Sequence, residues 1–358
     1  MSNHRIIRLR QAMEARGLEA LFVASKVNRR YLTGFTGSSG YVLITLDRAV
    51  LLTDFRYMSQ ANEQAQGFDV IEHAVTMTDT LKQLLAEIRV NRLGFEQEHV
   101  AYGTFAAYNK ELQPVELVPV SGLVEELRMI KDEAELAIMR EAAQLADQTF
   151  SHILNFLKPG VSEQDINLEM EFFMRKNGAT SSSFDTIVAS GERSALPHGV
   201  ASERIIQGNE FIKLDFGAYY QGYCSDLTRT VVLGKPTDKH IEIYNIVLEA
   251  QLYALEHIRS GMTGREADSL ARDIIKRYGY GDNFGHSLGH GLGMEIHEYP
   301  RLAQAGETVL TPGMTVTVEP GIYVPGFGGV RIEDDIVITA NGIEILTQST
   351  KQLLVLDM

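Results

Sequence analysis

The sequence predicts an α/β domain over residues 1–122, followed by an α+β domain over residues 123–358 that contains two similar halves. Two domains are expected because 358 residues exceed the usual size of a single domain. Short strand and helix patterns alternate in the first third, whereas two similar segments recur about 101 residues apart in the remainder. Alternation is typical of a sheet covered by helices, and recurrence is typical of a duplicated unit.

The first domain is expected to contain a mixed sheet. A charged amphipathic helix ends at Gly17, where glycine can close a helix. Apolar runs at residues 19–25 and 41–54 predict strands, and helical spacing predicts helices at residues 80–90 and 102–113.

The second domain begins with a long helical pattern over residues 125–157. Residues 157–179 then align with residues 258–280. Each copy has a glycine turn, a capping box that starts at Ser162 or Thr263, and a helix that ends at glycine. The copies predict two halves with related folds.

Each copy is followed by a predicted hairpin that carries two acids. The first hairpin contains Asp215 and Asp226, and the second, over residues 314–339, contains Glu319 and Glu333. Because the acidic pairs occupy equivalent places in related halves, a pseudo-symmetric domain with one central site is expected.

The first hairpin is expected to turn between Tyr220 and Gln221. That register places Asp215 directly opposite Asp226 on one face of the sheet. A one-residue bulge at Gly222 would make the two acids diagonal neighbours.

In the second hairpin, an odd-numbered loop around Gly326 would place Glu319 opposite Glu333. Four facing carboxylates would repel one another strongly in a partly dry site. Any one of them alone is more simply a solvated strand residue, but two divalent cations would balance the set. The sequence therefore predicts a dinuclear metal site.

The segment at residues 284–300 offers a neutral ligand, His286 or His290. Its many glycines argue against the helix that a helical zinc motif requires, and they would let loops approach a metal closely. Oxygen-rich ligation with one imidazole favours Mn²⁺, Co²⁺ or Fe²⁺ over structural Zn²⁺.

His198 and His297 each lie just before one of the hairpins, about 99 residues apart. This matched placement favours a shared active-site role over two structural histidines. Cys224 shares a strand face with Asp226, but no base accompanies it, so it is expected to be a packing residue.

Composition excludes several functions. With a net charge of -14 and no basic cluster, neither nucleic acid nor an anionic membrane is expected as a partner. No apolar run approaches the roughly 20 residues of a membrane span, and the N-terminal helix lacks the apolar core of a signal peptide. A single cysteine fits a reducing cytoplasm.

Four motifs carry a family resemblance: LDFGAYYQGYCSDLTRT, GHGLGMEIHE, VTVEPGIY and VRIEDD. Across residues 125–358 they resemble the dinuclear metallopeptidases with the pita-bread fold, which include aminopeptidase P, prolidase and methionine aminopeptidase. Residues 28–45 and 51–61 resemble the N-terminal domain of the proline-specific members and of creatinase. The resemblance implies a creatinase-like α/β domain before a pita-bread catalytic domain.

The resemblance implies that Asp215 binds one metal ion, that His290 and Glu319 bind another, and that Asp226 and Glu333 bridge them. Mn²⁺ or Co²⁺ is favoured, with Zn²⁺ or Fe²⁺ as alternatives. No ligand position departs from the family pattern, which disfavours creatinase activity because creatinase lacks the metal site.

It further implies that His198 and His297 contact the scissile carbonyl and the tetrahedral intermediate. His286 matches a further active-site histidine, Arg331 would pack near the bridging acids, and Tyr323 would lie near the substrate.

The implied activity is hydrolysis of the Xaa-Pro bond at peptide N-termini by a metal-bridging hydroxide, with Glu319 moving the proton. Prolidase cuts only dipeptides, whereas aminopeptidase P accepts longer chains, and the sequence leaves this choice open. The alternatives are an aminopeptidase without proline specificity, a hydrolase of another amide or a phosphoester, and a non-catalytic peptide-binding protein. Family members are often dimers, so a cytoplasmic homodimer is expected.

Overall fold

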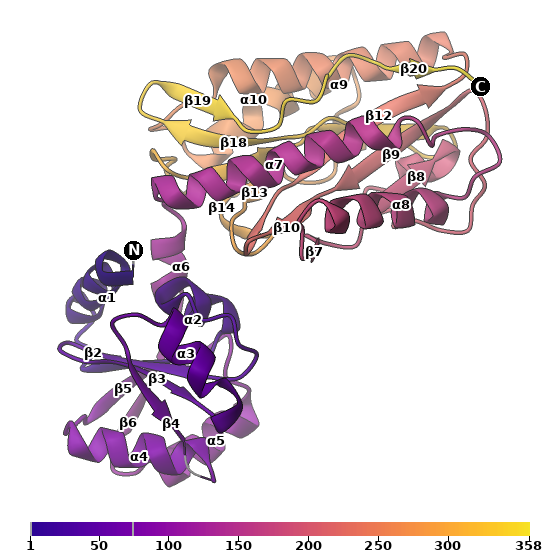
Figure 1. Cartoon of the computed structure of the whole chain (residues 1–358). Coiled ribbons are helices and arrows are strands. Elements are labelled where there is room, and N and C mark those ends of the chain that lie inside the picture. The colour runs from indigo at the N-terminus through magenta and orange to yellow at the C-terminus, as the bar shows by residue number, and fades with distance from the viewer. Residues whose placement is uncertain (1, 74) are drawn as a thin grey trace. The chain divides into compact units, whose positions relative to one another are not determined.

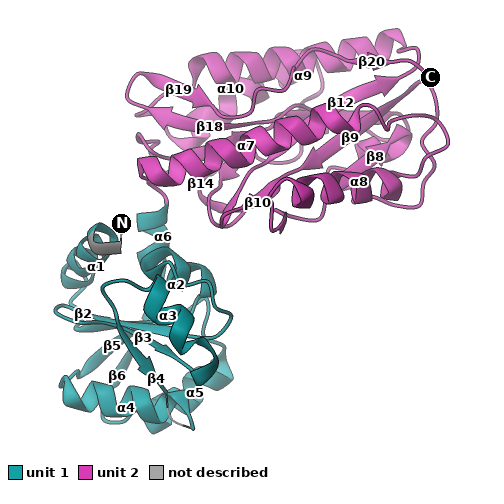
Figure 2. Ribbon diagram, in the orientation of Figure 1, with its two compact units in different colours: residues 1–128 teal, residues 129–358 magenta. Residues whose placement is uncertain are grey.

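The computed structural model describes residues 2–73 and 75–358. It divides into two compact units, Met1–Arg128 and Met129–Met358 (Figures 1 and 2). The domain boundary expected between residues 122 and 123 precedes helix α6 (Leu123–Arg128), which this division places in the first unit.

The first unit contains one six-stranded mixed sheet with the order β4-β3-β2-β1-β5-β6. Strand β2 is antiparallel to both β1 and β3, whereas the β1–β5, β3–β4 and β5–β6 pairs are parallel, so the predicted mixed sheet is confirmed. The strands are β1 (Ala20–Val23), β2 (Tyr41–Thr45), β3 (Ala49–Thr53), β4 (Asp69–Glu72), β5 (Arg92–Glu96) and β6 (Glu116–Val120).

The helices of this unit are α1 (Ser2–Ala15), α2 (Lys26–Thr33), α3 (Met58–Gln64), α4 (Met77–Glu87), α5 (Tyr102–Glu111) and α6, with a short 3₁₀ helix η1 (Phe55–Tyr57). The predicted helices at residues 80–90 and 102–113 correspond to α4 and α5. The single run at residues 41–54 forms two strands, because a turn at Asp47 separates β2 from β3.

The second unit contains four long helices that run alongside its strands (Figure 1). They are α7 (Glu133–Ile153), α8 (Glu163–Lys176), α9 (Asp238–His257) and α10 (Gly264–Arg277). The long helical pattern predicted over residues 125–157 corresponds to the end of α6 and to α7, with a break at residues 129–132. Helix α6 ends at Arg128, and Asp132 then caps α7 with its side chain, which starts a separate helix.

The strands of this unit form two small sheets and two larger ones, with orders β11-β10-β7, β16-β17, β20-β12-β9-β8 and β14-β13-β15-β18-β19. The strands of the first half are β7 (Ser181–Ser182), β8 (Ile187–Ser190), β9 (Glu210–Phe216), β10 (Ala218–Tyr220), β11 (Tyr223–Cys224) and β12 (Leu227–Leu233). Those of the second half are β13 (Gly289–Gly291), β14 (Glu298–Leu302), β15 (Thr315–Val318), β16 (Gly321–Val324), β17 (Gly328–Arg331), β18 (Asp334–Thr339), β19 (Gly342–Ile345) and β20 (Val355–Leu356). Two 3₁₀ helices, η2 (Gly191–Ala195) and η3 (Gly281–Asn283), complete the unit.

The predicted repeat is visible in matching local structure. Ser162 and Thr263 both form capping boxes, at the starts of α8 and α10. Each also makes an isolated β-bridge, Ser162 with Ile205 and Thr263 with Val309. The two copies therefore fold alike and connect alike to the strands that follow them.

The register predicted for the first hairpin is wrong by two positions. Asp215 pairs with Thr228 and not with Asp226, because the turn residues are Gln221 and Gly222, both with positive φ. This two-residue turn suits a glycine at its second position. A shift of two keeps Asp226 on the same face, as a diagonal neighbour of Asp215.

The register predicted for the second hairpin is confirmed. Strands β16 and β17 pair from Gly321 with Arg331 to Val324 with Gly328, which leaves a three-residue loop centred on Gly326. Strands β15 and β18 pair Val318 with Asp334 in the same register. Glu319 and Glu333 therefore occupy opposing positions between the two ladders.

Candidate metal centre

One cavity of about 300 Å³ in the second unit gathers the predicted acids and histidines. It is lined by Asp215, Asp226, Glu319, Glu333, His198, His286, His290, His297 and Arg331, together with Phe184, Ile187, Pro197, Ser287, Ile296 and Arg301. Tyr323 does not line the cavity but contacts two residues that do. Its hydroxyl lies 2.8 Å from His286 Nε2 and 2.7 Å from Arg331 Nη1. All the residues singled out for the site thus come together.

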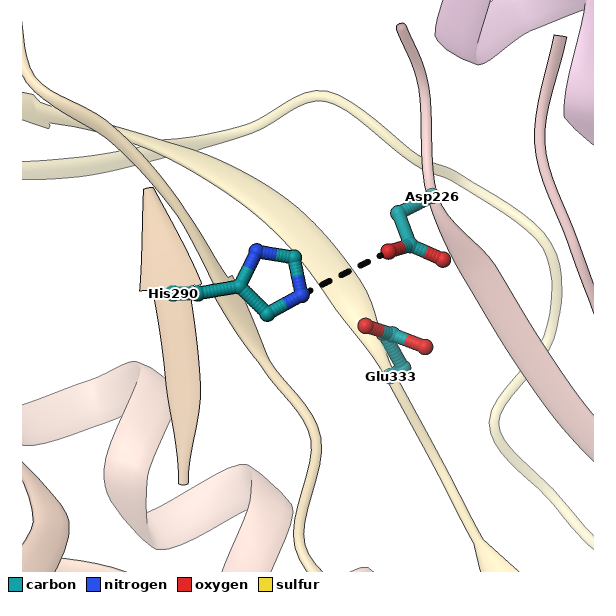
Figure 3. Close-up of side chains that lie close together, drawn as sticks. All are labelled: Asp226, His290 and Glu333. Atoms are coloured by element: carbon teal, nitrogen blue, oxygen red, sulfur yellow. Dashed lines mark ion pairs between the residues drawn. The ribbon is translucent and has the colours of Figure 1, made fainter. Parts of the chain in front are cut away.

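Asp226, His290 and Glu333 form the tightest group. Figure 3 shows both carboxylates directed toward the imidazole of His290. Their ligand atoms all lie within 4.8 Å of one another, and each of the three side chains is buried. His290 Nε2 is 3.7 Å from Asp226 Oδ2 and 3.5 Å from Glu319 Oε1.

His290 reaches this position because glycines flank it in strand β13. A Cβ atom on Gly289 would lie 1.9 Å from the carbonyl oxygen of Thr317, and one on Gly291 would lie 2.2 Å from that of Tyr299. The strand can therefore approach its neighbours only without side chains at these positions. The predicted absence of a helix here is confirmed.

The tautomer of His290 is set by the backbone. Its Nδ1 lies 3.1 Å from the carbonyl oxygen of Gly291, to which it can donate only as Nδ1–H. Nε2 then presents a lone pair toward Asp226 and Glu319. Burial, with a contribution from His297, lowers the pKa of His290 to about 3, so the imidazole is neutral, as a metal ligand requires.

The cavity contains strong carboxylate repulsion. Burial, reinforced by the neighbouring acids, raises the pKa values of Asp226 and Glu333 well above their usual range. Burial also raises the pKa of Glu319 to about 8, against the opposing charge of Arg331. Such shifts mean that the carboxylates hold their charges poorly without added positive charge.

Arg331 supplies part of that charge. Its Nη2 donates to Asp215 Oδ2, its Nε donates to the Thr228 hydroxyl at 3.1 Å, and its Nη1 donates to the carbonyl of Pro197 at 3.1 Å. Burial disfavours the charged form of Arg331, but Tyr323 and the neighbouring carboxylates, Asp215 first, hold its pKa well above its usual value. Arg331 is the arginine that pairs directly with an acid here, and Arg301 also lines the cavity, so four carboxylates share two guanidinium groups.

A divalent metal centre fits these residues. Asp226 Oδ1 is buried and has no hydrogen-bond partner among the described residues, which is costly for a carboxylate oxygen. Four carboxylates and one neutral imidazole form an oxygen-rich donor set of the kind that Mn²⁺, Co²⁺ and Fe²⁺ accept. Metal ions would provide both the missing partner and the missing charge.

The remaining histidines lie around the cavity. His198 and His297 line the cavity, and both are also exposed to solvent. The His297 ring packs edge-on against that of His290, with ring centroids 4.4 Å apart. His286 is partly buried, and burial lowers its pKa to about 3. Burial also lowers the pKa of His297. Cys224 is buried and its thiol pKa is raised to about 12 by burial, which agrees with a packing role.

Sequence reasoning missed three residues of the site. Thr228 donates to Glu333 Oε2, and Asp335 Oδ2 accepts the backbone N–H of Asp226 at 2.8 Å. Each lies two residues after a predicted ligand, so strand alternation could have found both. Arg301 lines the cavity because β14 pairs it with His290, a register that the sequence did not indicate.

Within residues 2–73 and 75–358, no helix combines the length and apolar character that crossing a bilayer would take.

Comparison with known proteins identifies the family. Residues 137–340 match Metallopeptidase family M24, and residues 5–130 match the Creatinase/Prolidase N-terminal domain. The Uncharacterized peptidase YqhT of Bacillus subtilis is 53% identical over 98% of this chain and 99% of its own length. The Xaa-Pro dipeptidase of Pyrococcus horikoshii is 40% identical over 98% of this chain and 99% of its own length.

A solved structure, "Xaa-Pro dipeptidase from Bacillus anthracis", is 54% identical to this chain and superimposes with a TM-score of 0.98. The match covers 99% of this chain and 100% of that chain. This chain therefore belongs to metallopeptidase family M24, the pita-bread metallopeptidases that its motifs resemble, and carries a creatinase/prolidase N-terminal domain.

Proposed function

We propose that this metallopeptidase is an Xaa-Pro dipeptidase, which hydrolyses the bond between an N-terminal residue and proline. The observation that carries the proposal is the convergence of Asp226, His290 and Glu333 around an unpartnered carboxylate oxygen in one cavity. Full-length similarity to the Xaa-Pro dipeptidases of P. horikoshii and B. anthracis supports the proline-specific reading.

Membership of this family implies divalent metal ions. We assign two ions to Asp215, Asp226, His290, Glu319 and Glu333, and favour Mn²⁺ or Co²⁺ because the donor set is oxygen-rich. When bound, such ions polarise a carbonyl group and lower the pKa of water toward neutrality. The carboxylates would then be ionised, since added positive charge lowers their pKa values.

The protein's own groups move the proton and bind the developing charge. Glu319 lines the cavity with its Oε1 3.5 Å from His290 Nε2, and as an ionised carboxylate it would take a proton from the attacking water and return it to the proline nitrogen. His198 and His297 line the cavity and would donate hydrogen bonds to the carbonyl oxygen of the scissile bond. His286 and Arg331 both hold the hydroxyl of Tyr323 beside them.

Arg301 favours dipeptides over longer chains. It lines the cavity and forms no ion pair with any described residue. A dipeptide places a carboxylate directly after its proline, and an unpaired guanidinium is a strong partner for it. A cavity of about 300 Å³ lies at the small end of the range for ligand pockets, which also suits a dipeptide.

The test starts from metal-free enzyme that receives Mn²⁺, Co²⁺ or Zn²⁺ separately. Cleavage of Ala-Pro, Ala-Pro-Ala and Met-Ala-Ser is then compared, with Ala-Pro expected to be cut fastest. Arg301→Met should raise KM for Ala-Pro more than for Ala-Pro-Ala, whereas Arg265→Met, an exposed arginine outside the cavity, should change neither.

Faster cleavage of Ala-Pro-Ala would point to an aminopeptidase for longer chains, and activity on Met-Ala-Ser alone would refute proline specificity. Metal binding without cleavage of any peptide would favour the non-catalytic alternative.

A homodimer in the cytoplasm completes the proposal, in line with the family resemblance and with the single buried cysteine, Cys224. Sedimentation equilibrium of the purified chain tests the dimer directly.

A further inference from the structure

A second cavity, of about 530 Å³, adjoins the catalytic cavity in the second unit. Phe184 lines both cavities and is therefore the residue that they share. The second cavity lies against the start of α8 and the segment that joins β7 to β8. Nothing in the proposed mechanism uses it.

Thr186, in the lining of this cavity, has an unsatisfied polar group. The residue is 4% exposed, and its hydroxyl oxygen is buried with no hydrogen-bond partner among the described residues. An unsatisfied buried hydroxyl destabilises a fold by roughly 1–3 kcal/mol. A group that enters the cavity and pairs with this hydroxyl would recover that loss.

The other polar groups of the cavity indicate the chemistry of its occupant. Gln164 and Asn167 come from α8, and Asp185 lies beside Thr186; in the described structure none of these three side chains forms a hydrogen bond or ion pair within the protein. The lining holds two carboxylates and no lysine, arginine or histidine; Glu171 pairs with Arg175 at 2.9 Å, which leaves Asp185 as the carboxylate without a counter-charge. An occupant that donates several hydrogen bonds and carries positive charge fits such a lining.

The place of the cavity relative to the repeat suggests which part of a substrate enters it. Arg301, proposed to hold the carboxylate of a dipeptide, belongs to β14 in the second half, whereas Phe184 and Thr186 belong to the first half. The second half would therefore hold the C-terminal carboxylate of a dipeptide through Arg301. The first half would hold the N-terminal residue, near Phe184.

We propose that this second cavity receives the side chain of the substrate's N-terminal residue and favours lysine or arginine there. The inference rests on the proposed Xaa-Pro dipeptidase function. It adds a specificity for the substrate's side chain, which a metal centre acting on the reacting bond would not supply.

The experiment compares kcat/KM for Lys-Pro and Leu-Pro in the manganese-loaded enzyme. The wild type should prefer Lys-Pro. Asp185→Asn and Thr186→Val should each lower the Lys-Pro to Leu-Pro ratio by roughly tenfold, the effect of one lost polar contact. Matched controls are Asp273→Asn, exposed on α10, and Thr149→Val, a buried threonine whose hydroxyl donates to the Leu145 carbonyl. Neither control should alter the ratio.

Gln164→Leu provides a third variant if Thr186→Val folds poorly, and it should also lower the ratio. A wild-type enzyme that cleaves both dipeptides without preference, with a ratio unchanged in all three variants, would overturn this inference and leave the dipeptidase proposal intact. Failure to cleave either dipeptide would overturn both.

Discussion

Arg331 donates a hydrogen bond to the carboxylate of Asp215 inside a cavity that holds four acids. The same guanidinium reaches Thr228, Tyr323 and the carbonyl of Pro197. It thereby links the carboxylate cluster to the segment that carries His198. The fork of five donors in arginine makes four simultaneous partners feasible.

Arg331→Lys should therefore impair the enzyme although the charge is kept. An ammonium group has three donors and a compact shape, so it cannot satisfy four partners that lie in different directions. We expect kcat/KM for a proline dipeptide to fall about 10–100-fold, the usual effect of losing an outer partner of a metal ligand. Steady-state kinetics check this, and Arg140→Lys, whose arginine pairs with Glu344 in a half-exposed position, serves as control. Unchanged kinetics in Arg331→Lys would show that the four contacts have no role in turnover.

Asp226→Asn should lose metal binding and activity together. The amide cannot supply the negative charge that a bridging ligand needs, so the loss should exceed the roughly 10–100-fold of an outer-shell change. The same substitution should make the metal-free protein more stable near pH 8, because it removes one of the repelling carboxylates. Calorimetric titration with Mn²⁺ and thermal unfolding with chelator measure both effects. Wild-type metal affinity in the variant would mean that Asp226 is not a ligand; Asp282→Asn is the exposed control.

Without metal, the stability of the protein should fall as pH rises from about 6.5 to 8. The pKa of Glu319 is raised to about 8, so the folded state holds a proton that the unfolded chain has already released, and raising the pH favours unfolding. His290, with a pKa lowered to about 3, has the opposite effect, but only below the unfolded histidine value of about 6.5. The free energy of unfolding is therefore expected to fall between pH 6.5 and 8. Each titrating group can contribute at most about 1.4 kcal/mol per pH unit to this fall.

Denaturant unfolding at pH 6.5, 7.2 and 8.0 with chelator measures this slope. Saturating Mn²⁺ should remove the fall or reverse it, because protons and metal compete for the same carboxylates. A metal-free protein that gains stability across the window would contradict the burial of the carboxylate cluster.

The acids and histidines predicted for the site do lie in one cavity, whereas only one of the two predicted hairpin registers is confirmed. Glu319 and Glu333 could be set opposite each other because Pro325-Gly326-Phe327 form an odd loop that fixes the pairing on both sides. The register predicted for the first hairpin was wrong because the turn could be formed either by Tyr220 and Gln221 or by Gln221 and Gly222. The structure uses the second pair, in which Gln221 adopts a positive φ. Because side chains alternate between the two faces of a strand, a register shift of two residues left Asp215 and Asp226 on the same face.

Two features of the second unit, an irregular strand pairing and a helix break, could not be predicted from the sequence. The pairing of His290 with Arg301 includes a register shift between His290 and Gly291, which no local pattern signals. Likewise, residues 125–157 have continuous helical periodicity, and the break before α7 depends on the capping box of Asp132. Periodicity alone does not report such a stop.

Lys213 should control the position of His198. It is fully buried, and its Nζ donates to the carbonyls of Ser194, Leu196 and Pro197 at 3.2, 2.6 and 3.2 Å. These carbonyls belong to the segment directly before His198. Lys213→Met keeps the bulk of the side chain but leaves three acceptors without their donor, so the segment should loosen. We expect kcat to fall about 10–100-fold with the manganese affinity unchanged.

A double-mutant cycle with His198→Ala separates this positioning role from a general loss of stability. If Lys213 acts through His198, the double variant should be no slower than His198→Ala alone, because the imidazole to be positioned is already gone. Additive losses in kcat would show that Lys213 acts elsewhere. Thermal unfolding of each variant in the presence of Mn²⁺ provides the matching stability measurement, since a purely structural defect would lower the melting temperature equally with and without His198.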